Sequence, residues 1–182
     1  MRESKPRLRL IRLCTLLISI FILTSSLQFC AAPTKKNPWD IVSTICEKEK
    51  SLPSGIIYST SADEESDEFL SPRLLLAAYA IPSDFDGIES AAVWLSKGMH
   101  PSEFAVVLCK DGRRVEDVAM YFKNKLAMLQ KNAPHASAVC GMTPELYASY
   151  ISEAQVCISG RYVALLISSD AVSARRAFLG SL

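Results

Sequence analysis

The stretch QVCISGRYVALLIS, residues 155–168, decides the fold of this chain. Its two apolar runs, 155–158 and 161–168, are separated by Ser159 and Gly160. Strand-like runs joined by two residues that include a glycine are typical of a tight β-hairpin. The sequence therefore predicts an antiparallel pair of strands near the end of the chain.

A second hairpin is predicted upstream. Residues 88–96 (IESAAVWLS) and 104–109 (FAVVLC) are strand-like, and the short connection 97–102 contains Gly and Pro. A connection of this length favours antiparallel pairing. Both strands are apolar on both faces, so we expect the sheet to be covered on both sides or to lie against a partner. Residues 55–60 (GIIYST) form a further short run that is compatible with a strand.

Helical patterns fill most of the remaining sequence. Ser71, Thr143 and Asp170 are N-cap candidates, and the first two precede a proline at the first helical position. The predicted helices span residues 39–50, 73–79, 113–131, 144–152 and 171–179. Between the third and fourth of these helices we expect a loop over 132–143. This order predicts an α+β domain, with a small antiparallel sheet of about four strands in two hairpins, packed with helices.

The first 32 residues differ in character from the rest. Five basic residues precede the uncharged apolar run 13–23 (LCTLLISIFIL), which is the order of a secretory signal. Residues 13–32 also match the ~20 residues that a membrane-spanning helix needs. We predict a signal peptide or membrane-anchor helix at 1–32, a linker at 33–38 and a single extracytoplasmic domain at 39–182. The domain would be secreted, or anchored in the cell membrane by residues 13–32.

The net charge of +1, from 20 basic and 19 acidic residues, averages two unlike parts. Beyond the first twelve positions there remain fifteen basic and eighteen acidic residues, a net charge of −3. Neither part predicts nucleic-acid binding. Five carboxylates lie within residues 61–68 (SADEESDE), but without the ligand spacing and central glycine of an EF-hand loop. We interpret this segment as a solvated acidic loop and predict no metal there.

The cysteines of the predicted domain allow several readings. Four cysteines can pair in three ways, and the shortest loop makes Cys140–Cys157 the favoured possible disulfide. The alternative is that all four are small buried hydrophobic residues. No pair has CxxC spacing and there are two histidines, so no metal site is predicted. The cysteines concerned are Cys46, Cys109, Cys140 and Cys157.

Motifs for dedicated chemistry are missing from the sequence. The seven glycines are at least eleven residues apart, which excludes GxGxxG and Walker A loops. There is no HExxH and no GxSxG. No catalytic residue, ligand-binding residue or cofactor is assigned. The arginine pairs 113–114 and 175–176 are read as solvated surface, or, if they converge in space, as a site for an anionic wall polymer or lipid head group.

Several segments together resemble a known family. They are residues 73–85 (RLLLAAYAIPSDF), residues 88–95, the turn from Gly98 to Glu103, and residues 156–167 with Gly160 and Tyr162. This pattern, over about residues 39–170, resembles a domain-of-unknown-function family of small exported proteins, many of them lipoproteins, from Firmicutes. The resemblance implies a location and a fold but no activity and no catalytic residues. This chain lacks the small residue that lipoproteins have before the modified cysteine, here Cys30, so lipid attachment is not expected.

These observations support three hypotheses about function. The favoured one is a non-enzymatic binding or interaction module of the cell envelope, whose partner is an envelope protein, a peptide or a wall component. The first alternative is a small extracellular hydrolase or thiol-redox protein that uses Cys109, Cys140 or Cys157 with His100 or His135. The second is a structural subunit of an envelope complex. The missing catalytic motifs favour binding over enzyme activity.

Overall fold

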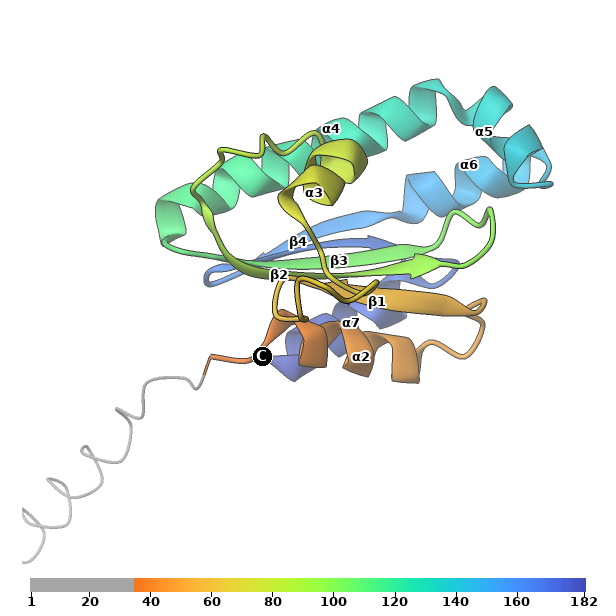
Figure 1. The fold of residues 1–182 in the computed structure, drawn as a ribbon. Helices are drawn as coiled ribbons and strands as arrows, with labels where there is room; N and C mark the ends of the chain where they lie inside the picture. Colours follow the sequence, from red (N-terminus) through yellow and green to blue (C-terminus); the bar gives the residue numbers. More distant parts are fainter. Residues whose placement is uncertain (1–34) are drawn as a thin grey trace, which may run out of the picture. The chain divides into compact units, whose positions relative to one another are not determined.

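The computed structural model describes residues 35–182, and Lys36–Leu182 form one unit built around a β-sheet (Figure 1). The predicted signal or anchor helix at 1–32 lies outside the described residues. Within residues 35–182 no helix is long and apolar enough to cross a membrane. In chain order the elements are α2 (Pro38–Lys48), β1 (Gly55–Ser59), α3 (Pro72–Tyr79), β2 (Ile88–Ser96), β3 (Glu103–Cys109), the 3₁₀ turn η1 (Gly112–Arg114), α4 (Val115–Lys131), α5 (Ala133–Val139), α6 (Pro144–Glu153), β4 (Gln155–Ser159), β5 (Tyr162–Ile167) and α7 (Ala171–Ser181).

The sheet has five strands in the order β1-β2-β3-β5-β4, and every neighbouring pair is antiparallel. The predicted α+β class, the antiparallel pairing and both hairpins are confirmed. The prediction of about four strands is one too few, because residues 55–59 pair with β2, from Gly55↔Ser96 to Ser59↔Ala92. A run as short as GIIYS becomes a strand through its partner, which sequence periodicity does not show.

Helices cover both faces of the sheet (Figure 1). Alternate strand residues point to opposite faces, so each strand contributes to two separate cores. On one face Val93, Val107 and Leu165 pack under α3, α4 and α6. On the other face Trp94, Phe104 and Leu166 pack under α2 and α7. The expectation of a sheet covered on both sides is therefore confirmed, and it explains why β2, β3 and β5 are apolar throughout.

The turn between β4 and β5 lies one residue later than expected. Ser159 pairs with Tyr162, so the two turn residues are Gly160 and Arg161 rather than Ser159 and Gly160. Gly160 has a φ of +57° and Arg161 has no positive φ. This fits a type II′ turn, which needs a glycine at its first central position.

The predicted caps begin their helices. The side chains of Ser71, Thr143 and Asp170 accept hydrogen bonds from backbone N–H groups three residues on, at 3.2, 3.2 and 2.9 Å. The predicted loop over 132–143 is wrong in its first half, where α5 forms. Pro134 looks like a helix breaker in sequence, but it lies in the first turn of α5, where the missing N–H breaks no hydrogen bond.

Candidate functional site at the edge of the sheet

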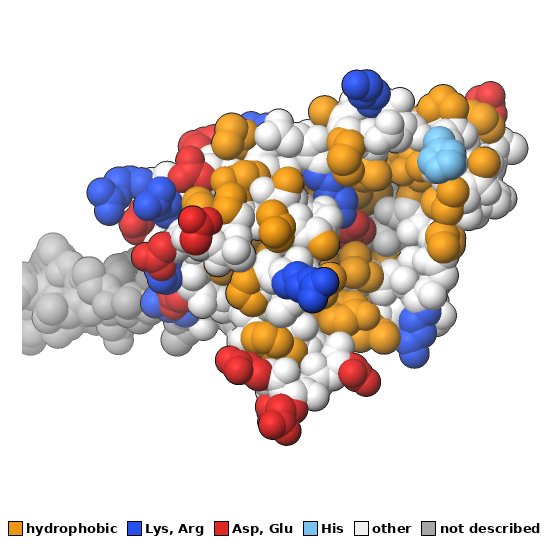
Figure 2. Space-filling model, turned by 45° about the horizontal axis from the view of Figure 1, so that its top comes forward, with side chains coloured by type: hydrophobic (Ala, Val, Ile, Leu, Met, Phe, Trp, Pro, Cys, Tyr) orange, Lys and Arg blue, Asp and Glu red, His pale blue; other side chains and the backbone are white. Residues whose placement is uncertain are grey.

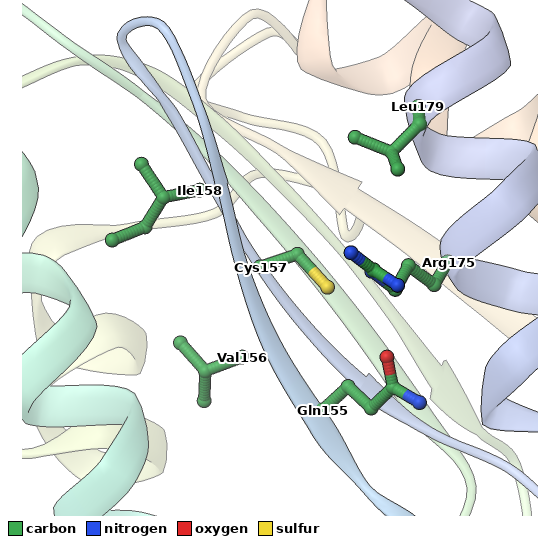
Figure 3. Close-up of a pocket in the computed structure, with 6 residues that line it drawn as sticks. All are labelled: Gln155, Val156, Cys157, Ile158, Arg175 and Leu179. Atoms are coloured by element: carbon green, nitrogen blue, oxygen red, sulfur yellow. The ribbon is translucent and has the colours of Figure 1, made fainter.

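A groove of about 360 Å³ lies between the edge strand β4 and helix α7 (Figure 3). Gln155 and Cys157 point from the strand toward the helix, from which Arg175 and Leu179 approach. Val156 and Ile158 point to the opposite side of the strand, as strand alternation requires. The groove is lined by Gln155, Val156, Cys157, Ile158, Arg175 and Leu179.

Helix α7 presents an exposed apolar stripe beside this groove. Val172, Arg175 and Leu179 are three and four residues apart, so they share one side of the helix. The exposed fraction is 60% for Val172 and 44% for Leu179. The opposite side of α7 is buried under the sheet through residues such as Phe178. The helix thus uses one side for the core and leaves an apolar side next to the groove.

Arg175 is the charged member of the groove. Its guanidinium faces the thiol of Cys157 (Figure 3). Burial raises the pKa of the Cys157 thiol, and the nearby Arg175 charge opposes that shift without reversing it. Within residues 35–182, the ion pairs use other basic residues, and none joins Arg175 to a carboxylate. Arg175 therefore has no carboxylate partner among the described residues, and the groove can accept an anionic group.

The outer edge of β4 offers backbone hydrogen-bonding groups. In a hairpin with a two-residue turn, the residues that flank the turn form a hydrogen-bonded pair, and such pairs alternate along the ladder. Ser159, Cys157 and Gln155 therefore bond to β5. Val156 and Ile158 direct their N–H and C=O groups the other way, and in the described part of the chain no strand pairs with that side.

At the other edge of the sheet, one end of β1 is covered. The backbone of Ser59 in β1 accepts a hydrogen bond from Leu70 at 3.0 Å and donates one to Glu68 at 2.9 Å. A parallel bridge also joins Ser59 to Phe69. The acidic segment 61–68 precedes this cover and folds into turns, one of them held by a hydrogen bond from the N–H of Glu65 to Asp63. The two edges therefore differ: the Ser59 end of β1 is covered by residues 68–70, whereas no strand of the described residues pairs with the outer side of β4.

A second group of polar side chains lies under the other helical layer. The ammonium group of Lys125 in α4 donates to both carboxylate oxygens of Glu103 in β3, at 2.7 and 2.6 Å. Each of these side chains is 11% exposed. The Lys125 nitrogen also lies 4.4 Å from the centre of the Tyr79 ring. Glu103, which the sequence pattern places at the end of a turn from Gly98, is in fact a strand residue that ties α4 to the sheet.

Tyr79 completes this group. Its buried hydroxyl makes no hydrogen bond to the residues that the structure describes. Burial raises the pKa of Tyr79, and the neighbouring Glu103 charge adds to the increase. Figure 2 shows hydrophobic side chains around a hollow on this side of the molecule, with charged side chains recessed in it. Because Glu103 and Lys125 already satisfy one another, we interpret the pair as structural rather than as a ligand site.

The four cysteines of the described residues are free thiols, and the expected Cys140–Cys157 bridge is not formed. The reason is their placement: Cys140 packs against the core under α4 and α6, whereas Cys157 belongs to the core on the opposite face of the sheet. The short segment between them in sequence contains α6 and the first two residues of β4. Burial raises the pKa of Cys46 to about 12 and of Cys109 to about 11. Thiols with raised pKa values are poor nucleophiles, because the thiolate is the reactive form.

The two histidines lie in different surroundings. The Nδ1 atom of His100 accepts a hydrogen bond from the N–H of Ser102 at 3.2 Å, and its ring meets Tyr150 edge-on at 5.4 Å. Burial lowers the pKa of His100. His135 lies exposed on α5. Over residues 35–182, no three His, Cys, Asp or Glu side chains are grouped as a metal site would require.

The arginine pairs singled out in the sequence lie in different layers. Arg113 pairs with Asp111, and Arg114 pairs with Asp117 and lies over the ring of Phe85. The other pair is on α7, across the sheet. The two pairs therefore do not converge on one anion site, and Arg175 lies by itself between the exposed Val172 and Leu179 on one side of α7.

Comparison with known proteins identifies no relative: no family model, no curated protein and no solved structure matches this chain. The resemblance to a family of exported Firmicutes proteins therefore stays a prediction.

Proposed function

We propose that the folded domain is a non-enzymatic binding module of the cell envelope that adds an extended segment of a partner protein to β4. The basic cluster followed by the apolar run at 13–23 supports export, with the domain either secreted or held at the membrane by residues 13–32. The open edge of β4 supports the binding role and is the observation that carries it.

An open edge strand is a template for another strand. Natural proteins block such edges with charges, prolines, bulges or covering segments. The β4 sequence QVCIS contains no charge and no proline, and it leaves Ile158 42% exposed. By contrast, the 68–70 segment covers the Ser59 end of β1. An unprotected edge beside a groove is the arrangement that strand-addition modules use to hold extended peptides.

Backbone hydrogen bonds at this edge are too weak to hold a partner without side-chain contacts. Val156 and Ile158 offer two donors and two acceptors, so an added strand gains about four hydrogen bonds of roughly 0.5–1.5 kcal/mol each. Association itself costs an estimated 4–15 kcal/mol or more. The backbone bonds therefore do not hold a partner alone, and the groove formed by Arg175 and Leu179 must contribute to affinity.

A proline substitution tests strand addition. Ile158→Pro removes an outward N–H, while the hydrogen bonds to β5 stay intact because Ile158 and Val163 are a non-hydrogen-bonded pair of the β4–β5 ladder. Ile158→Val keeps the N–H and serves as the matched control. We expect the full-length chain to select peptides from a random eight-residue library, the Val variant to retain them and the Pro variant to lose at least tenfold in affinity.

Circular dichroism of both variants checks that they fold equally well. If the Pro variant binds the selected peptides as tightly as the wild type, the partner does not pair with β4 and the proposal fails. It fails equally if the library yields no binder.

A further inference from the structure

We infer that the β4 groove recognises a carboxylate, and that its occupant is an extended segment of another protein with an Asp or Glu at an interior position opposite Cys157. This inference rests on the proposed strand addition and names the chemistry of the partner. It follows from the position of Arg175 relative to the free edge.

The register places one partner residue under Arg175. Cys157 is the middle residue of β4, between the two residues whose backbone groups face outward. An added strand that bonds to both Val156 and Ile158 has a residue directly opposite Cys157, with Cβ atoms about 4.5–5.5 Å apart. That side chain points to the α7 side, where Figure 3 shows the Arg175 guanidinium facing Cys157.

The required anion is a side chain rather than a chain terminus. Because hydrogen bonds form on both sides of the position opposite Cys157, the residue there lies inside the bound segment. A guanidinium can hold a carboxylate with two parallel hydrogen bonds. The side chain of Gln155 points to the same side of β4, and its amide carries N–H donors as well as an oxygen acceptor (Figure 3). No acidic residue lines the groove to compete for these donors.

The neighbouring positions of the segment are predicted to be apolar. They point to the other side of the sheet, next to Val156 and Ile158. Val156 packs against the core under α4, and Ile158 is 42% exposed beside it. A partner residue there covers an apolar surface that water now contacts. The expected pattern in the partner is therefore apolar–acidic–apolar.

A second copy of this chain fits the edge poorly. If two β4 strands paired antiparallel through residues 156 and 158, the twofold axis would pass near Cys157. Both Arg175 side chains would then lie on the same side of the sheet, facing one another across the axis. Two guanidinium groups repel, whereas a carboxylate at that position attracts, so the charges favour a different partner.

Segments of this chain do not match the pattern either. Residues 1–34 contain five basic residues and one acidic residue, which is the wrong charge for Arg175. Residues 61–68 are acidic but consist of consecutive carboxylates and small residues, without apolar neighbours in alternation. The charges of these segments thus favour a segment of a separate protein as the occupant.

Two matched peptide pools test this inference with the full-length chain. Each pool holds seven-residue peptides, blocked at both ends, with mixed Val, Ile and Phe on either side of the centre and Thr outside. The centre is Asp or Glu in one pool and Asn or Gln in the other. Binding is measured by fluorescence anisotropy to the wild type, to Arg175→Gln, and to Arg176→Gln, which removes the same charge from the adjacent exposed residue outside the groove.

We expect the acidic pool to bind the wild type and Arg176→Gln about 5- to 10-fold more tightly than the amide pool, and this preference to vanish in Arg175→Gln. A third pool that ends at the central position with a free carboxylate distinguishes a terminus from a side chain. Tighter binding of that pool than of the acidic pool overturns the inference.

The remaining outcomes separate the two proposals. If both blocked pools bind equally and Ile158→Pro weakens both, strand addition stands and carboxylate recognition is wrong. If neither pool binds, both proposals are wrong. If the chain forms a dimer in sedimentation that Ile158→Pro dissolves, and neither pool competes with it, the occupant of β4 is a second copy.

Discussion

Replacing Lys125 with methionine should destabilise the domain strongly. Methionine keeps an unbranched apolar stem but removes the ammonium group that holds both oxygens of Glu103. The carboxylate then lies at the start of β3 with 11% of its side chain exposed and no cation within the pair. The change therefore measures the cost of an uncompensated buried charge.

The expected magnitude follows from burial. Removing one partner of a buried pair costs about 3–5 kcal/mol, and the residual exposure of Glu103 places this pair at the low end of that range. The lost contact with the Tyr79 ring adds about 0.5–1 kcal/mol. We therefore expect a loss of about 3–4 kcal/mol. With a urea dependence of about 2 kcal/mol/M, the unfolding midpoint falls by about 1.5–2 M.

The double variant Glu103→Leu, Lys125→Met separates the pair from its surroundings. Replacing both charges with apolar groups of similar volume is often neutral or stabilising, so the double variant should lie within about 1 kcal/mol of the wild type. Urea unfolding of the full-length chain and of the single and double variants, followed by circular dichroism, gives the complete cycle. A loss below about 1 kcal/mol for Lys125→Met, or a double variant that loses the sum of the single losses, refutes this account.

Three further predictions concern packing and ionisation. Tyr79→Phe should stabilise the domain by about 1 kcal/mol in urea unfolding, since the buried hydroxyl has no hydrogen-bond partner in the described part of the chain; a clear loss would reveal a bond to Glu103. Gly55→Ala should destabilise the domain by about 1–3 kcal/mol, because an added Cβ would lie 2.3 Å from the Trp94 ring. The control Gly98→Ala should change stability little, because its Cβ meets open space. Equal thermal unfolding midpoints for the two variants would contradict this prediction. Because the pKa of Cys46 is raised, its contribution to stability is fully present below about pH 9 and is lost as the pH rises toward about 12. Over that pH range, the free energy of unfolding in urea should therefore fall less steeply for Cys46→Val than for the wild type.

The sequence predicted the elements that are determined by residues close together in the chain. The runs 88–96 and 104–109 and the hairpin near Gly160 became strands because their apolar residues and short links leave few alternatives. The caps at Ser71, Thr143 and Asp170 have a local mechanism, which made them equally accessible. The seven-residue helix α5 was missed and the turn was misplaced by one residue, at a proline and a glycine whose effect depends on position.

The candidate site depends on features that no single segment contains. That β4 lies at an edge follows from β5 pairing with β3, a long-range choice that hairpin signals do not determine. The burial of Glu103 depends on the Lys125 side chain of a helix more than twenty residues away. The separation of Cys140 from Cys157 depends on which face of the sheet each one reaches.

The contact between α2 and α7 has a consequence for how this protein is made. These helices are the first and last elements of the described chain, they lie side by side on one face of the sheet, and they share one core (Figure 1). The core around Trp94 therefore cannot close until α7 has emerged from the ribosome or from any channel through which the chain passes. Until then the part of this core that Phe178 fills stays uncovered, so apolar side chains remain accessible to chaperones. Because Arg175 and Leu179 are on α7, the groove beside β4 also forms only after that helix has packed onto the sheet.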